Sequence, residues 1–573
     1  MQAYYNPFEY EAANKFDFDQ IIDYYIEDFN YSRFIKSKRN VFLVGERGTG
    51  KTMTLLYNSL PVQVQKAMKD KSVLDLDFLA IYVPCKTPLM HRREYELLDP
   101  LRAAIISEHL LVLNTMFAIA ETLTCVEGLI ESELNNVLSD DAEYVLNFKL
   151  PKKRPFLEAL KQAIQREVLS TQQAINQKVP DAFYDKARSF SSSVLPLMSC
   201  LKKIPKISKS HFAMMFDDVH DLNEYQVRAL NSWISYRENF QFSFKVATAK
   251  VDQPTQITAS GGTILDGHDY VLIDMEQPYQ NQDSAFGHLA RQIIEKRLVK
   301  IAAGKSPEEF FPVNPSFEKD LEASQRKASI EAKKRFNDPK QISDYVYKYG
   351  RAEYFRNRSA KANRPPYSGF DMLVHLSTGV IRNLLEPCYW MYDRVYSERR
   401  SDAAQESSVD FIDPDIQTEI ILERSKRKWE WIRNRLDKSI EGCSRDQAVQ
   451  IYQLFDNLAV LFRERLLKHK SEPRAIAFTI SELDFAKLPE LEALLKIARK
   501  AQILYAHASS AKDLGRRETY YVPNRILWPD RGLDPVGQHA RVSIRASTLW
   551  FAAKENKKLP FVHVEEDREG LFP

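Results

Sequence analysis

A motif at residues 45–52, "GERGTGKT", constrains this chain more than any other feature. It fits the pattern G-x-x-x-x-G-K-[ST], directly follows the apolar run "VFLV" and opens the helical pattern "KTMTLLYNSL". Such a motif between a strand and a helix indicates a phosphate-binding loop. The chain is therefore expected to fold around an α/β domain with a parallel sheet.

The spacing of the motif assigns a role to each residue. The glycines allow a tight turn in which backbone N–H groups close on a phosphate, the lysine places a charge on the β- and γ-phosphates, and the last hydroxyl reaches Mg²⁺. The helix that follows points its N-terminus at the anion. The residues expected to bind ATP or ADP are Gly45, Gly48, Thr49, Gly50, Lys51 and Thr52, of which Thr52 also binds the metal.

Two aspartates end the apolar run "FAMMFDD" at residues 212–218. Asp217, at the carboxyl end of a strand beside the phosphate loop, is expected to hold Mg²⁺ directly or through water. Asp218 is expected where a carboxylate that activates water is needed. The alternative is a buried strand that ends in two turn-forming aspartates.

A hydroxyl ends the next apolar run, "FSFKVATA" at residues 242–249. Thr248 is expected to contact the γ-phosphate or the attacking water, and Lys250 is a second candidate for the same neighbourhood. An ordinary hydroxyl at a strand end is the alternative for Thr248.

Five short apolar runs alternate with helical patterns, which indicates a parallel sheet with crossover helices. They lie at residues 41–45, 79–85, 212–218, 242–249 and 270–276. Between the second and third runs, at about residues 86–211, apolar residues recur at three- and four-residue spacing, as in "LRAAIISEHLLVLNTMFAIAETL". This stretch is predicted to be a helical insertion.

The phosphate loop, the acidic strand, the polar end of the next strand and "STGVIRNLLEPC" at residues 377–388 together resemble an AAA+ ATPase. The likeness is nearest to the origin-recognition and Cdc6-type initiator ATPases and the related STAND signalling ATPases. "FDDVHDL" is similar to the D-D-V-x-x-L motif of the STAND group. The resemblance spans about residues 6–396. It implies a five-stranded sheet with the phosphate-loop strand central, ATP and Mg²⁺ as cofactors, and a helical lid whose Arg382 reaches the γ-phosphate.

Two departures from the AAA+ pattern point to slow hydrolysis. Asp218 stands where AAA+ enzymes usually carry the longer glutamate, so its reach is reduced. The stretch "KVDQPTQITASGGTILDGHD" contains no arginine to serve as a finger, which leaves Arg228 and Arg237 as fallback candidates.

The pattern divides the chain into three predicted domains. A nucleotide-binding domain is expected at residues 1–276, with its insertion at about 86–211. A helical lid with a basic segment is expected at residues 277–440, and a winged-helix-like domain at residues 441–573. The tail supports the last expectation because it runs helix, strand, helix, helix, then a strand pair.

Basic residues mix with aromatic ones in two lid segments, at residues 344–369 and 424–435. Cations neutralise nucleic-acid phosphates, and aromatic rings stack on bases. The alternative is a solvated helix face with its aromatic rings in the core. The cations of the first segment are Lys348, Arg351, Arg356, Arg358, Lys361 and Arg364.

The predicted winged helix offers a second basic surface. Its outward helix, "LEALLKIARKAQI", carries Lys496, Arg499 and Lys500, and its wing tip, "KDLGRRE", carries Arg516 and Arg517. In the initiator group such a domain binds DNA, whereas other winged helices bind proteins, so the fold does not decide the role.

Composition excludes several classes of function. A formal net charge of +3 is too small for bulk electrostatics to name a partner. The five cysteines are widely spaced with no C-x-x-C pair, which argues against a disulfide framework or a zinc site and fits a reducing cytosol. The most apolar stretch, residues 110–120, is far shorter than the roughly 20 residues of a membrane span. A cytoplasmic protein without a membrane partner is expected.

Three functions remain open from the sequence. The first is a nucleotide-dependent switch of the initiator type that hydrolyses ATP slowly and binds duplex DNA through the lid and the winged helix. The second is a STAND-like signalling ATPase of a prokaryotic defence or regulatory system, whose tail binds a separate effector protein. Either can assemble into a nucleotide-dependent homo-oligomer. The third is a scaffold in which the nucleotide is structural.

Overall fold

The computed structural model describes most of the chain. The described residues are 5–27, 31–88, 90, 98–130, 143, 146–147, 149–150, 154–176, 186–236, 242–251, 253–276, 285–357, 365–401, 409–468, 475–480, 488–508, 519–536 and 541–560.

Backbone contacts divide the chain into two compact units. The first unit is residues 11–277, and the second unit is residues 1–10 with 278–573. The first ten residues thus pack with the second unit, although the sequence places them ahead of the first. The predicted division at residues 440/441, between lid and winged helix, stays a prediction.

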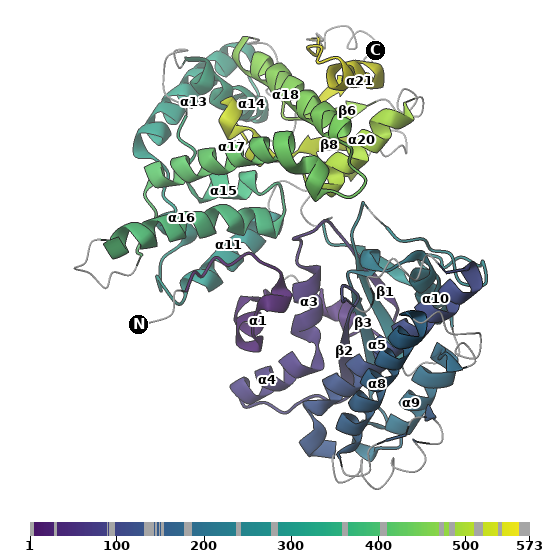
Figure 1. Cartoon of the computed structure of the whole chain (residues 1–573). Coiled ribbons are helices and arrows are strands. Elements are labelled where there is room, and N and C mark those ends of the chain that lie inside the picture. The colour runs from purple at the N-terminus through teal and green to yellow at the C-terminus, as the bar shows by residue number, and fades with distance from the viewer. Residues whose placement is uncertain are drawn as a thin grey trace. The chain divides into compact units, whose positions relative to one another are not determined.

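The first unit is built on the predicted five-stranded parallel sheet (Figure 1). Its strands run in the order β2-β3-β4-β1-β5. They are β1 (Val41–Val44), β2 (Phe78–Pro84), β3 (His211–Asp217), β4 (Phe242–Thr248) and β5 (Val271–Asp274). The strand before the phosphate loop, β1, is an interior strand flanked by β4 and β5, while the middle position belongs to β4.

Helices cover both faces of this sheet because alternate strand residues point to opposite sides. On one face, Val41 and Leu43 pack with Leu55 of α3 (Lys51–Asn58) and Ile35 of α2 (Ser32–Ile35). The other face packs against the helices of the insertion and α10 (Glu224–Ser235). The unit also contains η1 (Ala13–Lys15), α1 (Phe18–Tyr24), α4 (Leu60–Asp70) and η6 (Val219–Asp221).

The predicted insertion is mostly helical where the structure describes it. It contains α5 (Pro100–Thr124), α8 (Phe156–Asn176), η4 (Phe190–Val194), α9 (Leu195–Leu201) and η5 (Pro205–Ile207). Among the described helices, α5 alone has the length and apolarity of a membrane span, but 72% of its apolar window is buried. It packs on β2, α8 and α10, so it is a core helix of this unit.

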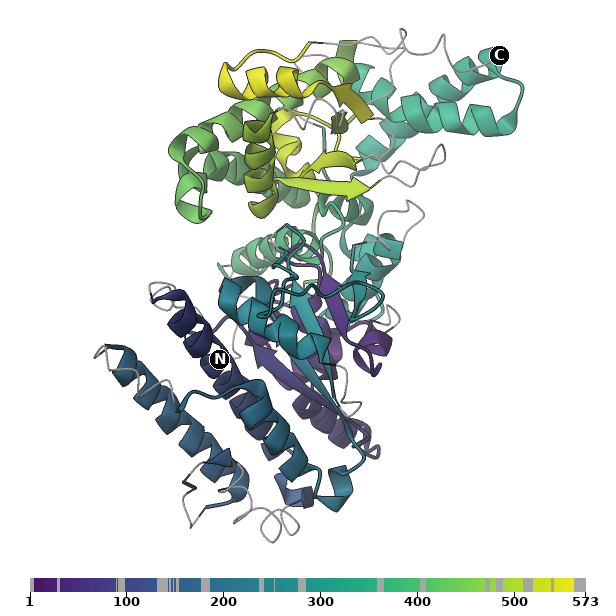
Figure 2. The same ribbon diagram turned by 90° about the vertical axis from the view of Figure 1, so that its right-hand side faces the viewer.

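The second unit begins with a helical region that takes in the chain's N-terminal segment. Phe8 is fully buried against Phe310, Phe311 and Tyr392. The helices are α11 (Ala285–Leu298), α12 (Pro307–Phe310), α13 (Pro315–Arg335), α14 (Pro339–Asn357), α15 (Phe370–Leu376), α16 (Ile381–Ser401) and α17 (Pro414–Ser439). Helices α13 and α14 pack side by side as a hairpin, seen in teal in Figure 2.

The tail forms a winged-helix-like domain within the second unit. Helix α18 (Arg445–Lys468) precedes β6 (Ala477–Ile480), and α20 (Pro489–Lys500) precedes the antiparallel pair β7 (Leu504–Ala508) and β8 (Thr519–Pro523). The sheet order is β7-β8-β6-β9. The sequence did not predict the edge strand β9 (Arg541–Ile544) or the closing helix α21 (Ala546–Lys554). Two short turns, η8 (Arg525–Leu527) and η9 (Pro529–Arg531), join the sheet to α17.

Candidate phosphate-binding site

The loop between β1 and α3 has a backbone that only small residues tolerate well. Gly48 and Gly50 have φ angles of 90° and 95°, in the left-handed region that favours glycine. A Cβ at Gly45 would lie 2.9 Å from Thr49 Oγ1, so a side chain there would displace Thr49. The Thr49 hydroxyl in turn donates to the carbonyl of Glu46 at 2.9 Å. The side chain of Thr49 thus folds back onto the loop backbone at Gly45 and Glu46.

Lys51 begins α3 and is 6% exposed. Its Nζ donates to the carbonyl oxygens of Gly45 at 2.7 Å and Glu46 at 2.9 Å. Burial lowers the pKa of the Lys51 ammonium, and nearby carboxylates, that of Asp217 first, oppose this shift. A buried ammonium held by two neutral carbonyls is suited to receive an anion, because an anionic ligand supplies the counter-charge that carbonyls lack.

Asp217 ends β3 and is 2% exposed. One carboxylate oxygen accepts a hydrogen bond from the Tyr82 hydroxyl at 2.8 Å, and the side chain also accepts one from Thr52. Burial, and then the carboxylate of Asp218, raise the pKa of Asp217 to about 6, while Thr52 and Tyr82 act in the opposite direction. The structure therefore brings together Thr52 and Asp217, the two residues that the sequence predicts as metal ligands.

Asp218 follows β3 with a left-handed backbone, φ 56°. Such a conformation is uncommon for a residue other than glycine and is found most often at turns and functional sites. It redirects the chain at the edge of the sheet, directly beside the phosphate loop: the loop's Arg47 lies 3.3 Å from Nε2 of His220 in the turn that follows. Asp218 is half-buried in this corner.

Thr248 ends β4 and pairs in register with Val44, the residue before the loop. It is 1% exposed, and among the described residues its hydroxyl oxygen has no hydrogen-bond partner. Buried polar atoms are almost always paired, so an orphaned hydroxyl at this edge is consistent with one that meets a ligand. Its role toward the γ-phosphate or water stays a prediction.

Lys250 is engaged elsewhere. Its Nζ lies 2.9 Å from Asp274 Oδ2 and 3.2 Å from Glu276 Oε2, both at the end of β5. Glu276 in turn accepts the N–H of Glu46, inside the phosphate loop, at 2.6 Å. Glu276 and Tyr82 were not predicted from the sequence. Glu276 ends the fifth apolar run, at the same sheet edge as Asp217 and Thr248. The rule that ligands bind at the carboxyl ends of parallel strands is the signal that would have found it.

Arg382 lies in the first turn of α16, half-buried, in the second unit. The turn before it contains two left-handed residues, Thr378 and Gly379. Asn383 holds this turn through hydrogen bonds to Ser377 O at 3.1 Å and to the Tyr505 hydroxyl at 3.0 Å. The role of Arg382 toward the γ-phosphate stays a prediction.

Neither fallback arginine gains support as a finger. Arg228 forms an ion pair with Glu224 on the same helix, four residues earlier. Arg237 lies outside the described residues.

The basic lid segment is largely internal where it is described. Arg351 forms an ion pair at 2.8 Å with the buried Asp534, and Arg356 donates to the carbonyl of Leu466 at 2.8 Å. Tyr354 and Phe355 are buried in the core of the second unit. These four residues therefore fit the alternative interpretation, in which the helix packs its aromatic rings into the core, and not the one in which they contact nucleic acid. Arg358, Lys361, Arg364 and the side chain of Lys348 lie outside the described residues.

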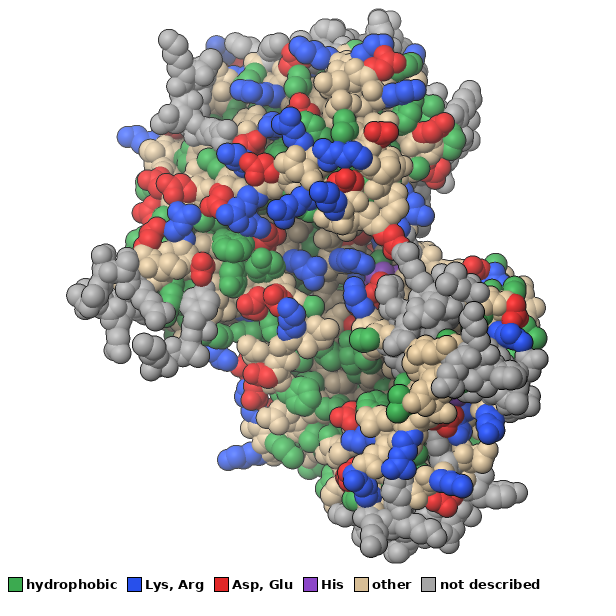
Figure 3. Space-filling view, viewed as in Figure 1, with side chains coloured by type: hydrophobic (Ala, Val, Ile, Leu, Met, Phe, Trp, Pro, Cys, Tyr) green, Lys and Arg blue, Asp and Glu red, His purple; other side chains and the backbone are tan. Residues whose placement is uncertain are grey.

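Exposed cations gather instead on α17 and α20. Lys496 is exposed on α20, with Arg499 and Lys500 half-exposed, whereas Arg516 and Arg517 of the wing lie outside the described residues. Lysine and arginine side chains lie in a row over the region of α16 and α17 in Figure 3. The exposed cations near the middle of α17 are Lys426, Arg427, Arg433 and Arg435.

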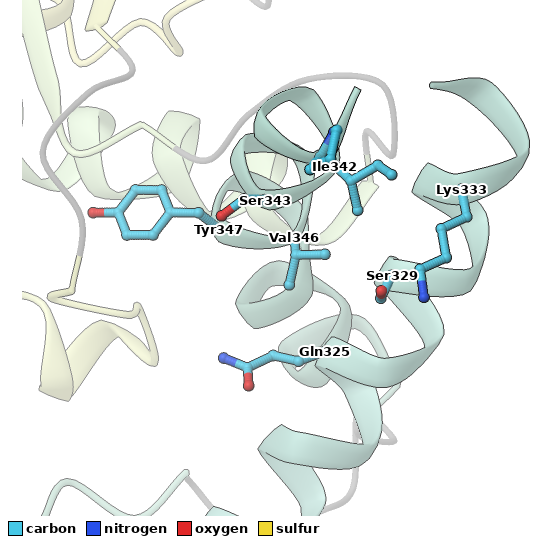
Figure 4. Close-up of a pocket in the computed structure, with 8 residues that line it drawn as sticks. Gln325, Ser329, Lys333, Ile342, Ser343, Val346 and Tyr347 are labelled. Carbon is cyan, nitrogen blue, oxygen red and sulfur yellow. The ribbon is translucent and has the colours of Figure 1, made fainter. Parts of the chain in front are cut away.

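A separate surface cavity of about 570 Å³ opens between α13 and α14 (Figure 4). Lys333 is the single charged residue among those that line it. Its lining has neither a glycine loop nor an acidic pair, so it lacks the donor set of a nucleotide site. The other lining residues are Gln325, Ser329, Pro339, Ile342, Ser343, Val346 and Tyr347.

The carboxyl ends of β1, β3 and β4 thus present one constellation. Lys51 and the loop backbone can hold phosphates, Thr52 and Asp217 can hold Mg²⁺ with hard oxygen ligands, and Thr248 faces the same edge. The donor set fits a nucleoside triphosphate with its metal. The five cysteines, all described, form no disulfide, and the described residues contain no cluster of His, Cys, Asp and Glu that would hold another metal.

Comparison with known proteins gives the same result. A model of the ORC-CDC6-like family matches residues 6–544. A crystal structure of Cdc6p from Pyrobaculum aerophilum is 10% identical in sequence and covers 90% of this chain and 93% of that chain, with a TM-score of 0.23, which is too low to support an inference. No curated protein matches the chain. The family model covers most of the chain and spans both units, so the chain belongs to the ORC-CDC6-like family of AAA+ ATPases.

Proposed function

We propose that this ATPase is a slow nucleotide-dependent switch that binds duplex DNA. The observation that carries the proposal is the meeting of Lys51, Asp217 and the orphaned Thr248 hydroxyl at one edge of the sheet. AAA+ ATPases of this family bind nucleotide, and this edge supplies a cation, a metal ligand and a polar contact for it.

Nucleotide binding requires Lys51 to change partners. Its ammonium leaves the carbonyls of Gly45 and Glu46 and turns toward the β- and γ-phosphates, where a charged hydrogen bond is stronger than a neutral one. The first-turn N–H groups of α3 point at the same anion. The loop glycines keep these N–H groups free of side chains.

Thr52 and Asp217 are the residues proposed to hold Mg²⁺. The hydrogen bond between the Thr52 hydroxyl and the Asp217 carboxylate supports this proposal, because it places the two groups close together. Tyr82 keeps the carboxylate of Asp217 oriented toward this edge. When bound, Mg²⁺ neutralises charge that develops on the phosphate oxygens during hydrolysis.

Slow hydrolysis follows from Asp218. A general base must lie within hydrogen-bond reach of the attacking water, and aspartate is one methylene shorter than the glutamate usual at this position. Its left-handed backbone fixes where that short side chain can point. We propose that the protein stays in its ATP state for long periods and acts as a switch instead of a motor.

Within the second unit, hydrogen bonds connect the turn before Arg382 to the tail, and we propose that they transmit the nucleotide state. The turn that carries Arg382 is bonded to the winged helix at two points: Asn383 to the Tyr505 hydroxyl of β7, and Thr378 Oγ1 to the N–H of Arg525 at 3.1 Å. Any shift of the turn therefore moves β7 and η8. This is the physical connection that a switch requires.

DNA binding is proposed for α20 together with α17. The two helices are joined, since Lys428 of α17 donates to the carbonyl of Ala501 just after α20. Helix α17 is also bonded to η8, because Trp429 donates to the carbonyl of Leu527 at 2.8 Å. Exposed cations on both helices supply phosphate contacts, which are salt-sensitive because they release counterions. The internal contacts of Arg351 and Arg356 remove those two residues from the proposed surface.

ATP turnover tests the proposal. Wild type is expected to hydrolyse ATP slowly, and duplex DNA is expected to change the rate. Lys51→Ala is expected to lose nucleotide binding, and Asp218→Ala to keep binding but lose most turnover. Fast turnover by wild type, or unchanged turnover in both variants, would contradict the proposed site.

Duplex binding is tested with a pair of multi-site variants. One variant changes to alanine the cations of the proposed surface, which are Lys426, Arg427, Arg433 and Arg435 of α17 with Lys496, Arg499 and Lys500 of α20. It is expected to weaken binding and to lower the salt slope by about one for each DNA phosphate that the protein no longer neutralises. The control changes Lys319, Lys327 and Lys334 on the hairpin helix α13, and it should bind as wild type does. Equal binding by both variants contradicts the DNA surface, and nucleotide response without any DNA binding favours the STAND-like alternative with a protein partner.

A further inference from the structure

Glu276 holds the phosphate loop from outside the motif. It lies two residues beyond the end of β5 and is 5% exposed. Its Oε1 accepts the backbone N–H of Glu46 at 2.6 Å. Glu46 is the residue directly after Gly45, so a buried carboxylate is fixed to the first turn of the loop.

Two neighbours fix Glu276 itself. Its Oε2 lies 3.2 Å from the Lys250 ammonium, which also lies 2.9 Å from Asp274 Oδ2. The other oxygen of Asp274 accepts the backbone N–H of Glu276 at 3.0 Å. The three side chains form a closed network at the ends of β4 and β5, which we call the β5 clamp (Lys250, Asp274 and Glu276).

The β5 clamp and Lys51 hold the same residue of the loop from two sides. Glu276 binds the N–H of Glu46, while Lys51 Nζ and the Thr49 hydroxyl bind its carbonyl oxygen, each at 2.9 Å. When Lys51 turns to a phosphate it must release that carbonyl. The contact from Glu276 then remains to hold the first turn in place.

The charges of the clamp matter for an anionic ligand. Asp274 and Glu276 place two carboxylates beside a site for phosphates, and like charges repel. Lys250 lies between the two carboxylates and offsets one of these charges. The field of Glu276 reaches the site, because its carboxylate is among those that act on the pKa of Lys51.

We propose that Glu276 is a positioning residue of the phosphate loop and that Lys250 both orients it and shields the bound phosphates from it. This inference rests on the proposed binding of nucleotide by the same loop. Lys250 is then a residue of the clamp and does not contact the γ-phosphate, although the sequence places it in that neighbourhood.

The test is titration of full-length protein with fluorescent ADP and ATP analogues in Mg²⁺, at low and high salt. Glu276→Ala is expected to lower the affinity for both nucleotides by about tenfold or more, because a charge-assisted hydrogen bond to the loop is removed. Glu276→Gln keeps an acceptor for Glu46 and is expected to recover most of that affinity. This recovery by the conservative variant marks a positioning role.

Lys250→Met gives a second, charge-specific readout. This variant leaves two carboxylates without their cation, so the affinity for ATP is expected to fall more than the affinity for ADP, by an extra factor of about three. High salt is expected to reduce this difference, because it screens the repulsion. The control is Glu167→Gln, which alters a partly buried ion pair with Arg188 in the insertion of the same unit. It should leave both affinities unchanged.

The outcomes separate this inference from the proposed function. Wild-type affinities in Glu276→Ala, or equal losses of ATP and ADP affinity in Lys250→Met at every salt concentration, overturn the clamp while the proposed function stands. If Glu276→Ala does not fold, Glu276→Gln and Lys250→Met still decide the question. Unchanged nucleotide binding in Lys51→Ala overturns the proposed function itself.

Discussion

At the scale of single residues, the phosphate-binding edge combines paired and unpaired polar groups. Asp217 is bonded to Thr52 and Tyr82, and Lys51 to two carbonyls, whereas the buried Thr248 hydroxyl has no partner among the described residues. An orphaned buried hydroxyl lowers stability, and we propose that a ligand completes this one.

Thr248→Val separates stability from activity. Valine keeps the shape of threonine and removes the orphaned oxygen, so the free protein is expected to be as stable as wild type or more stable by up to about 1 kcal/mol. ATP binding is expected to change by less than about threefold, while turnover falls by about tenfold or more, as expected when an interaction made in the transition state is removed. Thermal unfolding and steady-state kinetics provide the check. Lower stability with unchanged turnover would mean that Thr248 is only a strand-end residue.

Individual residues also show what the sequence can predict. The motif residues Lys51 and Asp217 were predictable because strand, turn and helix fix their neighbourhood locally. Glu276 and Tyr82 were missed because their contacts join positions far apart in the chain, 230 and 135 residues from their partners. Lys250 lies two residues beyond the end of β4 and is paired with the carboxylates of Asp274 and Glu276, which the sequence did not predict.

At the scale of elements, the insertion is stabilised by a histidine buried between two of its helices. Nε2 of His109 on α5 is hydrogen-bonded to the Thr171 hydroxyl on α8 at 3.0 Å, and its Nδ1 accepts the N–H of Arg188 at 3.0 Å. Because Nδ1 is an acceptor, the neutral ring carries its proton on Nε2. Burial, and then the charge of Arg188, lower the pKa of His109 to about 4.

Acid is therefore expected to loosen the insertion. Unfolded histidine has a pKa near 6.5, so between about pH 6.5 and 4 the unfolded state binds more protons and the folded state loses stability as pH falls. The full loss at this site is about 3 kcal/mol. His109→Gln is expected to be less stable at neutral pH but to show a flatter pH dependence over this window. Denaturant unfolding of both proteins at several pH values checks this, and parallel curves would contradict it.

The contact between the lid turn and the winged helix gives a second prediction for elements. Tyr505→Phe removes a hydroxyl that serves Asn383 at 3.0 Å and Asn524 at 3.4 Å. We expect a loss of about 1 kcal/mol in stability and a weaker effect of ATP on DNA affinity, with nucleotide affinity unchanged. Tyr520→Phe is the matched control, since Arg541 of β9 lies over that ring and its hydroxyl has no hydrogen bond among the described contacts. An equal effect of ATP on DNA affinity in both variants would contradict the proposed coupling between the lid turn and the winged helix.

The elements themselves were predictable to different degrees. The five strands of the first unit were found because buried parallel strands are continuous apolar runs. The edge strand β9 was missed because "RVSI" alternates in burial and is short. The basic segment at residues 344–369 was ambiguous from sequence, because a helix such as α14 can bury its aromatic rings and use its arginines internally, as Arg351 and Arg356 do.

At the scale of the whole molecule, the chain combines a nucleotide-binding unit with a unit that carries both Arg382 and the winged-helix-like domain. The family model spans the two, at residues 6–544. The N-terminal segment packs in the second unit through Phe8 and Asn6, so the chain passes from the second unit to the first and back again. The chain therefore crosses between the two units twice.

The central claim is that nucleotide at the phosphate loop controls DNA binding by the tail. The most direct measurement is the affinity of full-length protein for duplex DNA at one fixed salt concentration, with ATP, with ADP and without nucleotide, in wild type and Lys51→Ala. We predict that wild-type affinity differs by about fivefold or more between ATP and ADP, the usual range of a coupling free energy, and that Lys51→Ala shows one affinity in all three conditions. Equal wild-type affinity with ATP and ADP would contradict the account.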